Sequence, residues 1–232
     1  MSPSTAAPRG RAPLRWALRW AQLAAFCLVA APAHAELPAG RVVYPLPDAI
    51  VAQARGVSWR EGCPVPLEQL ALIELRHVDM QGAEKTGQLI IHKDEAAAVL
   101  SVFEELYAAR FPIKQVRLID HYGGDDDKSM ADDNTSGFNC RGVGGSAKWS
   151  QHAYGLAIDL NTVENPYVRT RPDGSLKVAP PAGAAYLDRA DQRPGMAVEG
   201  SVVVAAFEKI GWKWGGRWRS SKDYQHFSKT GG

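Results

Sequence analysis

The sequence predicts a domain of the α+β class, in which antiparallel strands and helices occupy separate stretches of the chain. Three observations support this prediction: a β-prone hairpin over residues 70–92, an amphipathic helix directly after it, and an alternating strand over residues 155–161. The chain has 232 residues. Once a short leader is set aside, this length is enough for one domain with a sizeable core.

The first 35 residues have the pattern of a secretory signal peptide. Four arginines precede an apolar run over residues 21–31, and Ala33-His34-Ala35 offers a small-x-small cleavage site. The run is well short of the roughly 20 residues that a membrane-spanning helix needs, so a membrane anchor is the weaker alternative. We therefore expect an exported protein of the periplasm or cell envelope, with no stable membrane insertion after signal cleavage.

The charge of the chain does not suggest a polyanionic partner. The full chain has a net charge of +2, but outside the leader 23 basic residues are balanced by 25 acidic ones. This balance argues against nucleic acid as a partner. We expect the mature protein to be a monomer.

Residues 36–60 are rich in Pro, Ala and Val without a clear period, and we expect them to form an N-terminal arm on a domain of residues 61–232. Within that domain, residues 70–80 are apolar and β-prone, residues 81–84 have turn composition, and residues 87–92 continue as a second strand. This order predicts a hairpin.

An amphipathic helix is predicted over residues 94–110, where apolar residues recur at helical spacing, Asp94 can cap the start and Pro112 forces a stop. A strand is expected at residues 115–120. The polar segment 121–145 that follows is long for a compact domain, and such a loop either covers a cleft or is disordered. The motif of residues 135–141 at the end of this segment favours a loop that covers a cleft.

Residues 155–161 alternate between apolar and small or polar side chains, which predicts a strand with Asp159 on the face away from the core. The Pro- and Gly-rich residues 162–198 are expected to form an irregular excursion whose tip lines the substrate cleft. A second helix is predicted over residues 201–210, with a serine cap and a glycine stop. The tryptophans after it are candidates for the core or for a substrate platform, and we expect at least one in the core.

His152, Asp159 and His226 are the candidate ligands of a catalytic metal ion. A catalytic zinc ion takes three protein ligands and keeps a fourth position for water. A mixed His, Asp, His set favours zinc over calcium, because imidazole is a good ligand for zinc and a poor one for calcium. The acidic clusters of the segment 121–145 lack the spacing of a calcium-binding EF-hand loop.

Asp223 lies three residues before His226, where it can act as a general base toward water if the Asp-x-x-His segment makes a turn. Hydrolysis of an amide also develops negative charge on the carbonyl oxygen, and a fixed cation nearby lowers that barrier. Arg141 is the candidate for this cation. The equally consistent alternative is that Arg141 pairs with one of the nearby aspartates.

Two cysteines lie outside the leader, Cys63 and Cys140. In an oxidising compartment an even pair is more often a disulfide than two free thiols. The alternative, a cysteine nucleophile, lacks an obvious base within the motif around Cys140. A bond between the two cysteines would hold Arg141 in place beside the site.

These motifs, read in order, resemble the zinc D-Ala-D-Ala carboxypeptidase family of the VanY and VanX type. The family signature is Ser-x-His-x-x-Gly-x-Ala-x-Asp, followed later by Glu or Asp-x-x-His. The Asp-x-x-His ending is most similar to the branch that includes L-alanyl-D-glutamate endopeptidases. The matching positions, without departure, are Ser150, His152, Gly155, Ala157, Asp159, Asp223 and His226.

The resemblance implies the hedgehog/DD-peptidase fold, a small antiparallel sheet with flanking helices. It also implies Zn²⁺ as the cofactor and peptidoglycan stem peptides as the substrate. The residues before Arg141 are Phe-Asn-Cys, where the family usually has Gly-Tyr-Arg. The expected site residues are the metal ligands His152, Asp159 and His226, the catalytic residues Asp223 and Arg141, and the substrate contacts Ser136, Ser150 and Tyr154.

The expected function is that of a secreted zinc metallopeptidase acting on peptidoglycan stems, as a D-Ala-D-Ala carboxypeptidase or an L-Ala-D-Glu endopeptidase. The alternatives are non-catalytic modules of the same fold that keep zinc and bind either the cell wall or a receptor. A degenerate module can lose its base without losing the metal. The presence of Asp223 therefore favours the enzyme.

Overall fold

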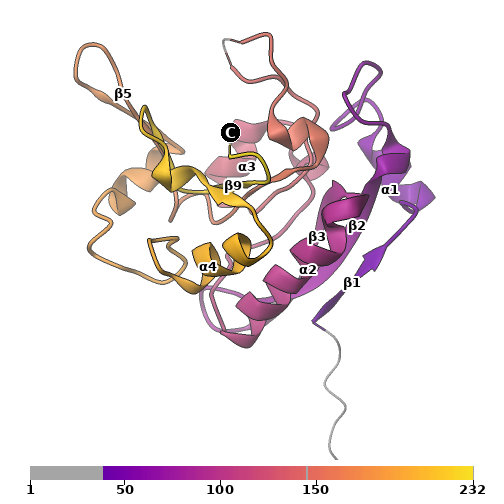
Figure 1. Cartoon of the computed structure of the whole chain (residues 1–232), viewed down its shortest axis with the longest axis horizontal. Coiled ribbons are helices and arrows are strands. Elements are labelled where there is room, and N and C mark those ends of the chain that lie inside the picture. Colours follow the sequence, from indigo (N-terminus) through magenta and orange to yellow (C-terminus); the bar gives the residue numbers. More distant parts are fainter. Residues whose placement is uncertain (1–38, 145, 232) are drawn as a thin grey trace, which may run out of the picture. The chain divides into compact units, whose positions relative to one another are not determined.

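The computed structural model describes residues 39–144 and 146–231 (Figure 1). The predicted signal peptide lies outside the described residues and stays a prediction. Across the described ranges, no helix combines the length and apolar character needed to cross a bilayer. The helices are α1 (Asp48–Ala54), α2 (Lys93–Ala108), α3 (Asp126–Ala131) and α4 (Val202–Lys209), with 3₁₀ turns η1 (Leu67–Gln69), η2 (Ile119–Tyr122), η3 (Gln151–Tyr154), η4 (Pro181–Tyr186) and η5 (Gly215–Arg217).

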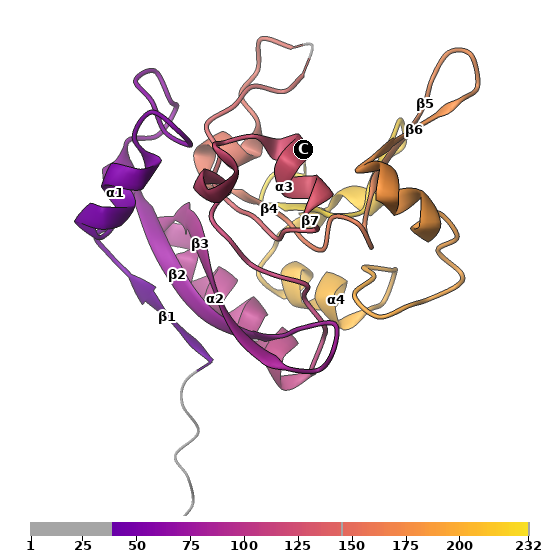
Figure 2. The same ribbon diagram turned by 180° about the vertical axis from the view of Figure 1, so that it is seen from behind.

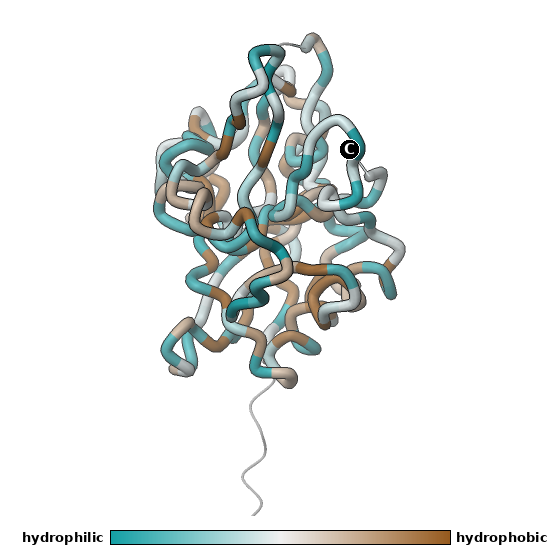
Figure 3. Tube along the Cα trace, turned by 90° about the vertical axis from the view of Figure 1, so that its left-hand side faces the viewer, coloured by the Kyte–Doolittle hydropathy of each residue, from teal (hydrophilic) through white to brown (hydrophobic). Residues whose placement is uncertain are grey.

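The strands form small antiparallel sheets, so the α+β class is confirmed. The tube in Figure 3 alternates between hydrophobic and hydrophilic along the chain, as expected of elements that bury one face and expose the other. The sheets have the orders β1-β2-β3, β4-β9-β7 and β6-β5-β8. The strands are β1 (Gly40–Val43), β2 (Leu70–Val78), β3 (Glu84–His92), β4 (Ala157–Asp159), β5 (Tyr167–Thr170), β6 (Leu176–Ala179), β7 (Lys213–Trp214), β8 (Lys222–Asp223) and β9 (His226–Ser228).

The predicted hairpin is present as β2 and β3, which pair from Leu70↔His92 to Val78↔Glu84. β1 extends this sheet along the other edge of β2. It comes from the expected N-terminal arm, whose described residues 39–60 also contain α1 and belong to the same compact unit as the strands and helices that follow. Both elements are too short to produce a visible period in the sequence.

The predicted amphipathic helix is α2, and its apolar face packs on the β1-β2-β3 sheet. Val99, Phe103 and Leu106 are almost fully buried there. Asp94 was expected to cap this helix, but the N-cap is His92. The His92 Nδ1 accepts a hydrogen bond from the Asp94 backbone N–H, which leaves the Asp94 carboxylate in the first turn.

The prediction of a strand at residues 115–120 is wrong. This stretch runs beside β3 but makes a single bridge, from Val116 to Thr135, and then turns into η2. The Val116 carbonyl accepts from the Gln88 N–H. The close approach is possible because β3 has a glycine here: a Cβ on Gly87 would lie 2.4 Å from the Val116 side chain.

The second helix prediction is confirmed by α4, which packs over the β4-β9-β7 sheet. Phe207 of α4 stacks on Phe227 of β9, with ring centroids 4.2 Å apart. Trp212 and Trp214 are buried in the same core. At least one tryptophan was expected in the core, and two lie there.

Residues 162–198 are not an irregular excursion throughout, because β5 and β6 form a hairpin within them. Its turn contains Pro172-Asp173-Gly174, with Gly174 at φ +81°. The hairpin projects from the body of the domain (Figures 1 and 2). β5 also pairs with β8, which carries Asp223, so the hairpin begins beside the expected base.

Candidate metal centre and active site

The structure brings the three predicted metal ligands together. One ligand atom from each of His152, Asp159 and His226 lies within 4.8 Å of the other two. Asp159 ends β4 and His226 begins β9, and the two residues are directly opposite in the ladder. Directly opposed residues project on the same face of a sheet. The pairing of β4 with β9 therefore brings the Asp159 and His226 side chains together.

His152 reaches this point from η3, and the motif around it explains how. Ser150 is the N-cap of η3, and its Oγ accepts from the His152 backbone N–H at 3.3 Å. Gly155 ends the turn at φ +67°, in the left-handed region that favours glycine. A Cβ at Gly155 would lie 2.6 Å from the His92 nitrogen. The glycine therefore lets the turn approach the end of β3.

The hydrogen bonding of His152 fits a metal ligand. Its Nδ1 lies 2.6 Å from the Gly137 carbonyl oxygen, which can only accept, so Nδ1 carries the proton. In the neutral ring, Nε2 then presents a lone pair toward Asp159 Oδ2, 3.1 Å away. Two acceptors at this distance need a proton or a cation between them. The Gly137 carbonyl is also the kind of second partner that orients metal-binding histidines.

The charges of the group are mutually stabilised. Burial opposes ionisation of Asp159, but His152 and His226 outweigh it and hold the pKa of Asp159 well below its usual range. Burial likewise acts to lower the pKa of His152, and the Asp159 carboxylate outweighs it, so that pKa is raised. His226 Nδ1 lies 3.1 Å from the other carboxylate oxygen, Oδ1. The Asp159 carboxylate thus contacts both imidazoles, and its negative charge favours a positive charge between the three side chains.

Asp223 lies next to this group, at the end of β8. Its Oδ1 is buried and has no hydrogen-bond partner among the described residues. Burial raises the pKa of Asp223 to about 7, opposed by His226 and reinforced by Asp159. Gly215 packs against it, and a Cβ there would lie 2.6 Å from the Asp223 carbonyl oxygen. A carboxylate with an unsatisfied oxygen and a pKa near neutrality suits a general base.

The structure shows the aspartate pairing of Arg141, and its role as a cation toward the developing negative charge stays a prediction. Its Nε forms an ion pair with Asp126 of α3. Its charge also acts to lower the pKa values of His152 and Asp223, so the guanidinium lies close enough to influence both. The aspartate pairing does not remove Arg141 from the site.

The three residues expected to contact substrate differ in their burial and in the groups that they contact. Ser150 is buried and its hydroxyl caps η3. Ser136 is 8% exposed and forms a two-hydrogen-bond bridge with Asp159 through its backbone. Tyr154 packs against the core on the other face of the first sheet. The structure therefore gives each a structural contact, and their contact with substrate stays a prediction.

The sequence offered a nearby aspartate as the partner of Arg141 without saying which one, and it did not reveal the role of Asn139. Asp126 Oδ1 accepts from Asn139 Nδ2 at 2.7 Å, and the Asn139 backbone N–H donates to the His152 carbonyl at 3.2 Å. Trp218 was also unassigned between core and platform, and its ring lies 5.3 Å from that of His226.

The disulfide between Cys63 and Cys140 is present, as predicted. It joins segments 77 residues apart and lies one residue before Arg141. The Cys140 N–H donates to the Ser58 carbonyl, which adds a backbone connection at the same point. The bond therefore anchors the segment that carries Arg141.

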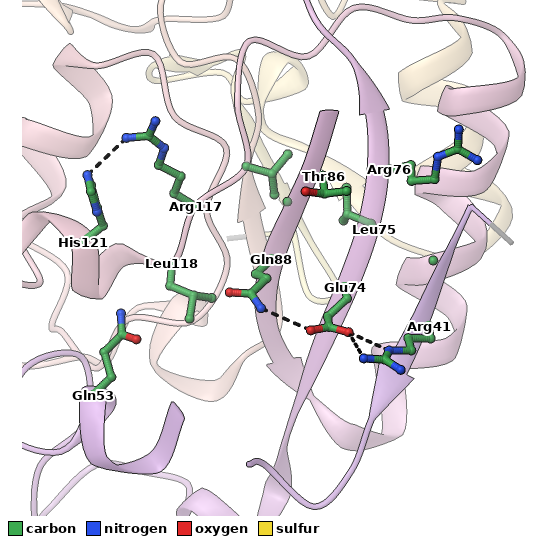
Figure 4. Close-up of a pocket in the computed structure, with 13 residues that line it drawn as sticks. Arg41, Gln53, Glu74, Leu75, Arg76, Thr86, Gln88, Arg117, Leu118 and His121 are labelled. Atoms are coloured by element: carbon green, nitrogen blue, oxygen red, sulfur yellow. Dashed lines mark hydrogen bonds and ion pairs between the residues drawn. The ribbon is translucent and has the colours of Figure 1, made fainter. Parts of the chain in front are cut away.

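A hollow of about 640 Å³ lies elsewhere, on the face of the first sheet opposite α2 (Figure 4). Its lining includes none of the site residues above. Glu74 at its centre pairs with Gln88 and Arg41. Antiparallel sheets commonly turn one polar face to water, and we assign this hollow no chemistry.

A buried His-Asp-His group beside an isolated carboxylate defines a candidate metallohydrolase site. Residues 144–229 match the model of a protein family described as D-alanyl-D-alanine carboxypeptidase. The match covers the metal ligands and Asp223, and it supports a metallopeptidase related to peptidoglycan. Arg141 lies outside the matched range. No curated protein and no solved structure was found to match the chain.

Proposed function

We propose that this protein is a secreted zinc metallopeptidase that hydrolyses amide bonds in peptidoglycan stem peptides, of the D-Ala-D-Ala carboxypeptidase or L-Ala-D-Glu endopeptidase type. The convergence of His152, Asp159 and His226 next to Asp223 is the observation that carries this proposal. The family match to residues 144–229 supports it. The hedgehog/DD-peptidase fold, export to the cell envelope and a monomeric state belong to the same proposal.

Zinc would be held by His152 Nε2, a carboxylate oxygen of Asp159 and His226 Nδ1, the atoms that already face one another. Two imidazoles and one carboxylate are a donor set that suits zinc. When bound, zinc supplies Lewis-acid polarisation of the scissile carbonyl and lowers the pKa of a water molecule.

Asp223 would accept a proton from the attacking water through Oδ1, the oxygen that lacks a protein partner. The same carboxyl would then donate that proton to the leaving amine. A pKa near 7 suits both steps, because the group can take and release a proton close to neutral pH.

Arg141 would stabilise the negative charge that develops on the former carbonyl oxygen. Its ion pair with Asp126 limits the rotation of the guanidinium but engages only part of its five N–H donors. The remaining donors would contact the substrate. The disulfide one residue earlier fixes the backbone from which the side chain extends.

The proposal is tested by incubating the zinc-loaded domain, residues 36–232, with defined muropeptides and identifying products by mass. Product should form and should disappear with chelator. Asp223→Asn should retain one zinc per chain and lose at least about 10²-fold in rate, as expected without a general base. If the wild type binds muropeptides tightly and releases nothing, the protein is a wall-binding module.

A further inference from the structure

The β6-β5-β8 sheet places Asp223 on a face that continues outward along the projecting hairpin. Tyr167 lies directly opposite Asp223 on one side and opposite Ala179 on the other. Directly opposed residues share a face, and so do residues two apart along a strand. Arg169 is two residues from Tyr167 and lies opposite Lys177. These two cations therefore share the face that begins at the base.

A ring contact confirms this arrangement. The Lys177 Nζ lies 5.9 Å from the centroid of the Tyr167 ring, over its face. Both Arg169 and Lys177 are exposed. Among the described residues, neither Arg169 nor Lys177 forms an ion pair with a carboxylate.

Two like charges directly opposite one another destabilise a hairpin. The nearest acid in the sequence, Asp173, forms no ion pair with either cation among the described residues. Its Oδ1 accepts from the backbone N–H and the hydroxyl of Ser175 in the turn, at 2.9 and 2.7 Å. A negative group supplied from outside the chain would relieve the repulsion between Arg169 and Lys177.

We propose that Arg169 and Lys177 form a subsite for a free carboxylate of the substrate. This inference rests on the proposed function and specifies its substrate class. Arg169 lies about 7 Å along β5 from Tyr167, and Asp223 lies about 5 Å away on the neighbouring strand. The subsite therefore suits a carboxylate roughly two to three peptide residues from the bond that Asp223 helps to cut. The preferred substrate is an acidic peptide that runs along β5. Lysine on an edge strand also deters pairing with other chains, and the experiment separates that role from the subsite.

The test uses two synthetic stem peptides that differ at one position, a free carboxylate in one and its amide in the other. Dissociation constants are measured by calorimetry in the zinc-loaded Asp223→Asn background, and KM and kcat in the active protein. The test variant is Arg169→Gln/Lys177→Gln. The charge-matched control is Arg60→Gln/Lys85→Gln, at two exposed positions on other parts of the chain.

The test variant removes two exposed ion pairs, each worth at most about fivefold, so it should raise Kd and KM for the acidic peptide about three- to tenfold and leave kcat unchanged. It should not affect the amide, and the control should affect neither peptide. Equal weakening of both peptides, or no weakening, overturns the subsite. If no peptide is cleaved but the carboxylate-selective loss of binding is seen, the proposed function fails and the subsite stands.

Discussion

Replacing Asp126 by asparagine tests whether the acidic segment serves the active site through Arg141. The Asp126–Arg141 pair is partly exposed, with 27% and 35% of the side chains accessible. Such a pair contributes at most about 1 kcal/mol. This free energy changes the equilibrium between Arg141 paired with Asp126 and Arg141 unpaired by about fivefold. Arg141→Ala, in contrast, should lower kcat by about 10²–10³, the loss typical of one oxyanion donor.

Initial rates of product release from a defined muropeptide measure the coupling between the two residues. Asp126→Asn should lower kcat about fivefold with little change in KM, because the guanidinium acts on the transition state. In the Arg141→Ala background the same change should have no further effect. Asp127→Asn, at the exposed neighbouring carboxylate, is the control and should leave the rate unchanged. Equal losses in both backgrounds would refute a positioning role for Asp126.

Three further changes have expected outcomes. Burial and the Asp133 carboxylate raise the pKa of Glu164 to about 8, so the folded state keeps a proton that the unfolded chain has lost. Stability should thus fall by about 2 to 3 kcal/mol from pH 6 to pH 8, and urea unfolding of Glu164→Gln should show a smaller fall; an identical fall would contradict this pKa. The double variant Cys63→Ser/Cys140→Ser should lose about 4 to 5 kcal/mol for a 77-residue separation, and an unchanged urea midpoint would contradict that. Asp159→Ala should lower zinc occupancy measured by mass spectrometry under native conditions, and full occupancy would remove it from the ligand set.

The site could be predicted largely because its residues lie in two short motifs with local geometry. Ser150 and Gly155 start and end the turn that carries His152, and Asp159 follows on the next strand. Spacing alone therefore encodes most of this half of the site. The pairing of β4 with β9, which brings His226 to Asp159, is a long-range contact that the sequence pattern did not reveal.

The residues that were missed act through contacts between distant segments. The sequence offered an aspartate partner for Arg141 but did not identify Asp126, which lies 15 positions away. β1 joins the first sheet from a segment with no clear period. The β5–β6 hairpin was missed because proline and glycine dominate residues 162–198, and such composition is typical of loops as well as of hairpin turns. The strand expected at residues 115–120 failed because a short apolar run does not show whether a partner strand exists.

Diffraction at the zinc absorption edge, from crystals of the domain grown with zinc, tests most directly whether two histidines and an aspartate share one ion. A single anomalous peak should lie between His152, Asp159 and His226, within about 2.3 Å of a nitrogen or oxygen from each. A zinc-saturated crystal with no peak there, or with its ion held by other residues, would contradict the metal centre and the peptidase activity proposed from it.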